Sequence, residues 1–151
     1  MKDKLKHLGQ IFLPLAIGGM ISFLIKGNIM DYETINKPFL APPKILFPIV
    51  WTFLYLLIGF LYYKNRQVSE NKETAYLYYL GLFLNFIWPI IFFSFKLYLL
   101  AVFVICLLTG FTYLLFLNYK KEGPQTGNFL ILYFLWLLFA TYLNIGIYLL
   151  N

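Results

Sequence analysis

Aromatic side chains recur every four residues in the apolar stretch 45–63. Phe47, Trp51 and Tyr55 occupy these positions, so on an α-helix they share one face. Aromatic faces stack well on flat apolar molecules. The stripe is therefore a candidate wall for a binding site, although packing against a neighbouring helix would use the same pattern.

Two later stretches carry similar faces. Each combines a tryptophan, an asparagine and a third residue: Asn85, Trp88 and Phe92 in 75–95, and Trp136, Ala140 and Asn144 in 128–150. An asparagine in the middle of an apolar helix either hydrogen-bonds a neighbouring helix or contacts a ligand, and both interpretations stay open. Pro89 predicts a kink, because proline lacks the N–H that a helix needs.

Small residues mark the two remaining stretches. Gly18, Gly19 and Ser22 in 8–25 would let another helix or a flat ligand approach the backbone. Cys106, the single cysteine, lies inside 97–117 and is expected to be a small buried side chain.

The sequence lacks the residues that conventional catalysis needs. His7 is the only histidine, and no Asp or Glu lies within the apolar stretches. A metal site, a Ser–His–Asp triad and paired acid–base catalysis are therefore not expected, and neither is ion pumping. Gly123–Gly127 indicates a turn rather than a phosphate-binding loop.

The apolar stretches are expected to cross a membrane as α-helices. The 151-residue chain is 62% hydrophobic and 12% charged, and its mean hydropathy is +0.77. The stretches free of charged side chains are 8–25, 45–63, 75–95, 97–117 and 128–150. About 20 apolar residues span a bilayer, and a charge at its centre costs at least about 2.5–3.5 kcal/mol. The predicted fold class is therefore an all-α, five-helix transmembrane bundle forming one domain, residues 1–151.

Charge predicts the orientation. The net charge is +6, but the 12 basic residues cluster beside the apolar stretches, which indicates contact with the lipid bilayer rather than nucleic acid. Eight lie on the amino-terminal side and four on the other, so the amino terminus is expected in the cytoplasm of a cell-membrane protein. Tyrosines near the ends of the stretches are expected at the membrane interface: Tyr62, Tyr63, Tyr76, Tyr78, Tyr79 and Tyr119.

The connections between the stretches differ in length. Residues 26–44 form a long one, 64–74 and 118–127 form two others, and the break around Lys96 is so short that it predicts a tight antiparallel hairpin. Three prolines, Pro38, Pro42 and Pro43, stiffen the first connection, which also has enough apolar residues to fold back over the bundle. It is therefore either a lid or a stiff surface connector.

Three motifs on three different stretches occur in order. They are Lys37–Pro43 running into Phe47–Tyr55, then Leu84–Trp88, then Trp136–Asn144. Together they resemble the translocator protein or tryptophan-rich sensory protein family, also called TspO/MBR or peripheral-type benzodiazepine receptors. The resemblance covers nearly the whole chain and implies a bacterial member, usually a homodimer, with a ligand pocket near the first connection. Small residues of the fourth stretch, Thr109, Gly110 and Thr112, would suit close helix contact.

The resemblance also implies ligands. Members bind porphyrins such as protoporphyrin IX and synthetic isoquinoline carboxamides, and some bacterial members are reported to degrade protoporphyrin IX in light. By motif, Trp51 and Trp136 would face the porphyrin and would be the catalytic residues if degradation occurs. The other expected ligand-binding residues are Gly18, Ser22, Tyr32, Pro42, Phe47, Tyr55, Asn85, Trp88, Phe92, Cys106, Ala140 and Asn144. No cofactor is required, and protoporphyrin IX or a haem-type tetrapyrrole is expected as the ligand.

Two positions depart from the family pattern. Leu40 replaces the tryptophan usual in the Trp-x-Pro-Pro segment, and no basic residue follows Tyr148, so cholesterol binding through that motif is not expected. The leading hypothesis is a porphyrin sensor, scavenger or carrier whose ligand lies between Trp51 and Trp136 and turns its carboxylates toward Lys37 or Lys44. Light-dependent porphyrin degradation is the enzymatic alternative. A purely structural or transporter-accessory bundle would instead pack Trp51, Asn85 and Trp136 against neighbouring helices with no void.

Overall fold

The computed structural model describes residues 2–151, and these are almost entirely helical. In chain order the elements are α1 (Lys2–Ile29), the 3₁₀ helix η1 (Met30–Glu33), α2 (Leu46–Arg66), α3 (Lys72–Pro89), the π-helical turn η2 (Ile90–Ser94), α4 (Tyr98–Glu122) and α5 (Pro124–Leu150). Five segments are long and apolar enough to cross a membrane. The predicted five-helix transmembrane fold is confirmed, and the chain is a multi-pass membrane protein.

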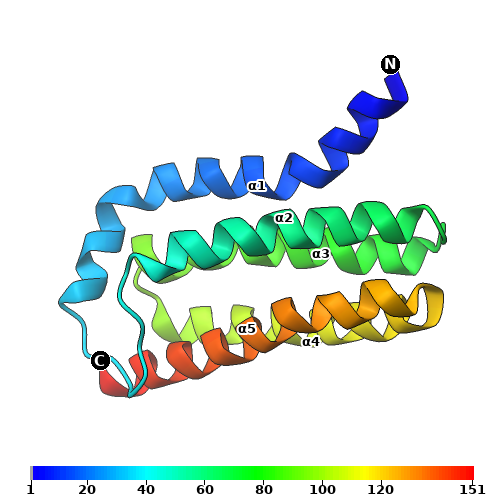
Figure 1. The fold of residues 1–151 in the computed structure, drawn as a ribbon. Helices are drawn as coiled ribbons and strands as arrows, with labels where there is room; N and C mark the ends of the chain where they lie inside the picture. Colours follow the sequence, from blue (N-terminus) through cyan, green and yellow to red (C-terminus); the bar gives the residue numbers. More distant parts are fainter. Residues whose placement is uncertain (1) are drawn as a thin grey trace.

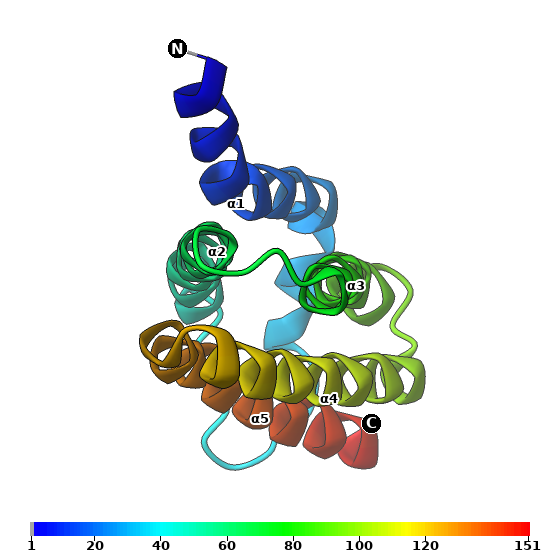
Figure 2. The ribbon, with the colours of Figure 1, turned by 90° about the vertical axis from the view of Figure 1, so that its right-hand side faces the viewer.

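The helices form three layers. Figures 1 and 2 show α1 on one side, α2 and α3 in the middle, and α4 and α5 on the opposite side. Short hairpins connect α2 to α3 and α4 to α5 at one end of the bundle, whereas the segment between α1 and α2 lies at the other end beside the carboxyl terminus (Figure 1). The two ends are therefore chemically distinct.

The first helix bends where it leaves the bundle. Figure 1 shows the amino-terminal part of α1 turning away from α2, and Pro14 lies inside this helix, where its missing N–H allows a kink. Nearby, α1 and α2 pack closely, because a Cβ on Gly59 would lie only 2.1 Å from the carbonyl oxygen of Ile11. Most of the remaining surface of α1 is apolar and exposed, as expected of a helix that faces lipid.

Aromatic rings fill the space between α2 and α3. Tyr62 and Tyr78 stack with ring centroids 3.8 Å apart and an interplanar angle of 2°. Both rings are buried, as is Tyr119. Of the tyrosines expected at the membrane interface, these three are buried between helices, whereas Tyr76 and Tyr79 are exposed.

The helices extend beyond the apolar stretches, and the last connection is shorter than predicted. Residues 118–127 were expected to join two helices, but α4 continues to Glu122, Gly123 alone forms the link, and Pro124 begins α5. Charged residues can continue a helix into the headgroup region, so charge marks the edge of the membrane rather than the end of the helix. Proline suits the first position of a helix because the N–H there needs no partner.

The hairpin between α3 and α4 is tight, as predicted. Pro89 ends α3, and the chain continues as a wider turn in which the N–H of Phe95 donates to the carbonyl oxygen of Ile90 over 3.1 Å. Lys96 has a positive φ of 54°, which lets the chain reverse within three residues. On α4, Thr112 is buried and the hydroxyl of Thr109 lies 3.2 Å from that of Thr141 on α5. These threonines therefore make contacts inside the bundle, whereas Gly110 on the same helix is exposed.

Glu122 ties together three elements at the hairpin end of the bundle. Its carboxylate accepts hydrogen bonds from the amide of Asn65 on α2 (2.7 Å), the amide of Asn71 before α3 (2.8 Å) and the hydroxyl of Thr74 on α3 (2.7 Å). Asn65 and Thr74 are buried. Hydrogen bonds to a charged acceptor are stronger than neutral ones, so this carboxylate stabilises the arrangement of α2, α3 and α4.

Candidate functional site

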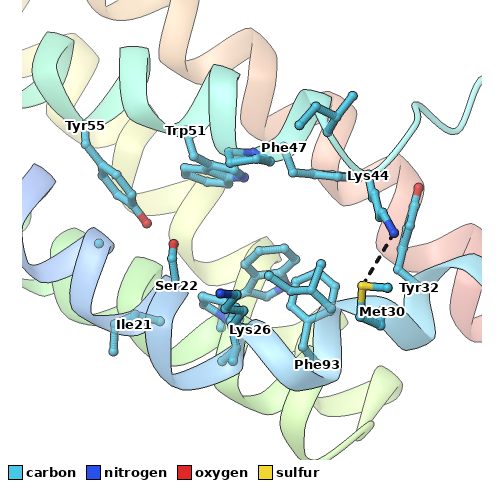
Figure 3. Close-up of a pocket in the computed structure, with 17 residues that line it drawn as sticks. Ile21, Ser22, Lys26, Met30, Tyr32, Lys44, Phe47, Trp51, Tyr55 and Phe93 are labelled. Carbon is cyan, nitrogen blue, oxygen red and sulfur yellow. Dashed lines mark hydrogen bonds between the residues drawn. The ribbon is translucent and has the colours of Figure 1, made fainter.

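A cavity of about 360 Å³ lies between α1, α2 and α3, beneath the long first connection. Figure 3 shows Phe47 and Trp51 on the α2 side, with Ser22, Lys26 and Phe93 across the space. The lining is mostly apolar: Gly18, Ile21, Ser22, Ile25, Lys26, Ile29, Met30, Tyr32, Lys44, Ile45, Phe47, Pro48, Trp51, Tyr55, Trp88, Pro89 and Phe93. Concave apolar spaces with a few polar groups are typical small-molecule sites.

The inner end of the cavity depends on a close approach between α1 and α2. A Cβ on Gly18 would lie 2.3 Å from Cε2 of Tyr55, so only glycine leaves room for this ring. The expectation that Gly18 lets a flat group approach the backbone is met by Tyr55 itself. Ser22 lies one turn further along α1 and faces the open space (Figure 3).

Tryptophans from two helices form an aromatic wall. The rings of Trp51 and Trp88 are 6.1 Å apart, centroid to centroid, and Trp51 is 5.5 Å from the ring of Tyr55. At the other end of the cavity, Phe47 meets Tyr32 edge-on at 5.1 Å. Tilted and edge-on aromatic contacts of this kind hold rings in defined orientations. The wall therefore presents a nearly continuous aromatic surface to the cavity.

The asparagines hold this wall from behind. The hydroxyl of Tyr55 donates to Oδ1 of Asn85 over 3.0 Å, and the amide of Asn85 donates to the hydroxyl of Tyr133 on α5. Trp88 Nε1 donates to Oδ1 of Asn144 over 2.9 Å. Both asparagines are buried, and neither lines the cavity. Of the two interpretations, hydrogen bonding between helices is the one observed, and its effect is to orient Tyr55 and Trp88.

The first connection (residues 30–45, called the lid below) borders the cavity with Met30, Tyr32, Lys44 and Ile45 at its two ends. The hydroxyl of Tyr32 donates to the carbonyl oxygen of Pro42 over 3.2 Å, so the start and end of the lid contact each other. Nζ of Lys37 donates to three carbonyl oxygens of the lid itself, those of Tyr32, Glu33 and Ile35. All three donors of this amine are therefore used within the lid, and the prediction that Lys37 meets a ligand carboxylate has no free donor to support it.

The lid also contacts the end of α5. The backbone N–H of Asn36 donates to the side chain of Asn151, whose amide donates back to the carbonyl oxygen of Asn36. Pro38 packs against Gly146, where a Cβ would lie 2.5 Å from the proline ring. The lid is therefore attached to the far layer of the bundle as well as to α1 and α2.

Two ion pairs fasten the short helix η1. Nζ of Lys44 lies 2.8 Å from Oε1 of Glu33, and Nζ of Lys96 lies 2.8 Å from Oδ2 of Asp31. The hydrogen bond and the charge of Asp31 raise the pKa of the Lys96 amine. Lys44 lines the cavity, whereas Lys96 does not, so only the first pair borders the space a ligand would enter.

The expected site residues separate into three groups. Those that line the cavity are Gly18, Ser22, Tyr32, Phe47, Trp51, Tyr55 and Trp88. Those one layer behind the lining are Pro42, Asn85, Phe92, Ala140 and Asn144, which bond to or pack with its residues or lie in the adjacent core. Cys106 and Trp136 lie elsewhere.

The positions of Cys106 and Trp136 differ from expectation. Cys106 is exposed on α4, next to the fully buried Ile105, so it faces outward rather than forming a small buried side chain. Trp136 is half-buried on α5, packs beside Phe139 with centroids 5.5 Å apart, and does not line the cavity. Trp136 therefore does not face Trp51 across this cavity.

The sequence analysis missed much of the α1 side of the cavity. Ile21 lies three residues after Gly18, and Ile25 and Lys26 lie three and four residues after Ser22. Ile29 completes the face. A search for positions three and four residues from Gly18 and Ser22 would have found them. Phe93 had no such signal, because it reaches the cavity only through the wider turn after Pro89.

Comparison with known proteins identifies the family. The TspO/MBR family matches residues 10–150. The chain belongs to the TspO/MBR family.

Members with curated names match over most of their length. The tryptophan-rich protein TspO of Archaeoglobus fulgidus is 35% identical over 97% of both chains. The translocator protein homolog of Schizosaccharomyces pombe is 33% identical over 92% of this chain and 88% of its own, and the tryptophan-rich protein TspO of Chlorobaculum tepidum is 34% identical over 93% and 92%. The resemblance seen in the three motifs is confirmed, and the TspO/MBR membership agrees with the five-helix fold.

Proposed function

We propose that the cavity binds a porphyrin of the protoporphyrin IX type, as a tetrapyrrole sensor, scavenger or carrier. The observation that carries this proposal is the aromatic wall: Trp51 and Trp88 present ring faces to an otherwise apolar space between α1, α2 and α3. Flat aromatic ligands stack on such faces. The Archaeoglobus fulgidus relative is also named a tryptophan-rich protein.

The size of the cavity bears on how a porphyrin would enter. Its volume of about 360 Å³ is near the lower end of the range of about 300–1,000 Å³ for small-molecule sites. A macrocycle would therefore need the lid or α1 to move.

Titration with protoporphyrin IX tests the proposal. Adding the porphyrin to purified protein in detergent should quench tryptophan emission and change porphyrin fluorescence until the site is saturated. Trp51→Phe should weaken binding because it replaces an indole of the wall with a smaller phenyl ring. If neither emission changes on mixing, the proposal is wrong.

A second tryptophan variant distinguishes binding in this cavity from the binding between Trp51 and Trp136 that the resemblance implies. Trp136→Phe should change the affinity little, because Trp136 does not line the cavity. A loss as large as that of Trp51→Phe would mean that the ligand reaches α5, as the resemblance implies.

The enzymatic alternative is light-dependent oxidation of the bound porphyrin by dioxygen. One observation favours it: Trp51 contacts the rings of both Tyr55 and Trp88 beside the cavity. An indole that gives an electron to the excited porphyrin would therefore have aromatic neighbours to share the radical, while the reduced porphyrin passes the electron to dioxygen as superoxide. Illumination of the complex should then bleach the porphyrin faster than free porphyrin, and Trp51→Phe should slow the loss. Equal rates for bound and free porphyrin would exclude catalysis.

A purely structural bundle is less well supported. That hypothesis predicted no void beside Trp51, Asn85 and Trp136. Asn85 and Trp136 do pack against neighbouring core residues, but Trp51 borders the cavity.

Charge favours an amino terminus in the cytoplasm, which we also propose. The basic residues of the two hairpins lie at the same end of the bundle as the start of α1 (Figure 1), so the eight-to-four division of basic residues applies to the folded protein. Labelling of a cysteine placed in the α2–α3 connection of a Cys106→Ser variant, in intact cells and in inverted vesicles, tests this orientation.

A further inference from the structure

The cavity lining carries two amines among otherwise uncharged residues. Lys26 lies near the end of α1, and Lys44 lies just before α2. Every other lining residue is uncharged. Cations at the rim of an apolar cavity attract a molecule that is apolar in the body and anionic at one edge.

The two amines differ in the partners that they already have. Lys44 is paired with Glu33 at 2.8 Å and also approaches Sδ of Met30 at 3.5 Å. Lys26 has no acidic partner among the side chains that the structure describes. Lys26 can therefore pair with a ligand anion directly, whereas Lys44 can do so only if its ion pair with Glu33 breaks.

Glu33 belongs to the lid, which makes its pairing more than a local contact. It lies on η1, the first part of the lid, and its side chain is 56% exposed. A ligand carboxylate that paired with Lys44 would release Glu33 and with it one of the two ion pairs that hold η1. The second pair, Asp31 with Lys96, would remain, and it does not border the cavity.

We infer that Lys26 and Lys44 form a carboxylate site at the edge of the cavity, and that Glu33 competes with the ligand carboxylate for Lys44. The inference rests on the proposed function and narrows its ligand class to flat amphipathic molecules with acidic groups on one edge. Coupling of this kind is reciprocal: if the ligand weakens the Glu33–Lys44 pair, then the pair weakens ligand binding by the same factor. Removing Glu33 should therefore strengthen binding, whereas removing Lys26 should weaken it.

Protoporphyrin IX and its dimethyl ester are the probes that test this, because they share the macrocycle and differ only in the carboxylates. In nanodiscs of neutral lipid, Lys26→Met should weaken binding of the free acid about fivefold, as expected for one partly exposed ion pair. Glu33→Gln should strengthen it by a similar factor. Both variants should bind the dimethyl ester as the unmodified protein does.

Asp31→Asn is the matched control for loosening the lid. It removes the other ion pair of η1, whose lysine does not line the cavity, so any change that it makes in affinity should be the same for the free acid and the dimethyl ester. If Asp31→Asn strengthens binding of the free acid over the ester as much as Glu33→Gln does, or if the Lys26 and Glu33 variants change the ester and the acid equally, the carboxylate site is refuted while porphyrin binding stands. Failure of the unmodified protein to bind either porphyrin would overturn the proposed function, and this inference with it.

Discussion

Gly18→Ala is the substitution that most directly tests how the cavity is built. The new Cβ would lie 2.3 Å from Cε2 and 2.6 Å from Cδ2 of Tyr55, far inside contact distance, so the ring must move. Tyr55 is buried and donates to Asn85, and the space beside it is the cavity. The ring can therefore yield into the cavity only by straining or losing this hydrogen bond.

The expected magnitude follows from three opposing effects. Alanine in a helix is favoured over glycine by about 1 kcal/mol, which roughly offsets the lower end of the cost of overpacking, about 1–3 kcal/mol. Loss of the donor to the buried Asn85 oxygen costs a further amount of about 1–3 kcal/mol. The net expectation is that Gly18→Ala lowers the free energy of unfolding by about 2 kcal/mol, and that it weakens porphyrin binding because Tyr55 occupies part of the cavity.

Gly19→Ala provides the matched control. The neighbouring glycine is exposed and has nothing within 4 Å of an added Cβ, so alanine there should stabilise the helix slightly, by up to about 1 kcal/mol. Unfolding in mixed detergent micelles gives the free energies, and porphyrin titration gives the affinities. If Gly18→Ala and Gly19→Ala behave alike in both assays, the close approach of α1 and Tyr55 is not what shapes the cavity.

Three further predictions concern the contacts around the site and at the far end. Asn144→Leu should lower the free energy of unfolding by about 1–3 kcal/mol, because it leaves Trp88 Nε1 buried without an acceptor; unfolding in detergent measures it. Glu122→Gln should destabilise the bundle by about 1–3 kcal/mol, because an amide replaces a charged acceptor of three hydrogen bonds, again measured by unfolding. Lys96→Met should lower the melting temperature at neutral pH, and the gap from the unmodified protein should close as the pH rises above about 10.5. Asp31 raises the pKa of the Lys96 amine above 10.5. The contribution of this amine to stability is therefore complete below pH 10.5 and is lost as the amine deprotonates at higher pH.

Each of these predictions has an outcome that would contradict it. Adding Trp88→Phe to Asn144→Leu removes the donor as well, so the double variant should be less destabilised than the two single losses together; simple additivity would show that the hydrogen bond contributes little. Glu73→Gln, at an exposed position near the same end, should have little effect, and an equal loss at both positions would point to net charge instead. A melting gap for Lys96→Met that persists at high pH would assign the effect to packing.

The sequence by itself determined the number, type and order of the membrane spans. The cost of placing charge in lipid acts on each residue wherever it lies, so the charge-free stretches could be found without knowing any contact. The tight hairpin at Lys96 follows from the same rule, because nothing longer separates two spans there. The three motifs also sufficed for family membership, which the match over residues 10–150 confirms.

Only the tertiary structure decided which face of each helix points inward. In a soluble protein the apolar face of a helix marks the core, but here the lipid and the core are both apolar, so periodicity carries little information about orientation. Cys106 was therefore expected to be buried but is exposed, and Trp136 was expected to face the ligand but lies outside the cavity. The wall is formed instead by Trp51 and Trp88, and the orientation of Trp88 depends on its hydrogen bond to Asn144 on α5. A contact between residues 56 positions apart is not determined by local spacing, because it exists only once α3 and α5 have packed together.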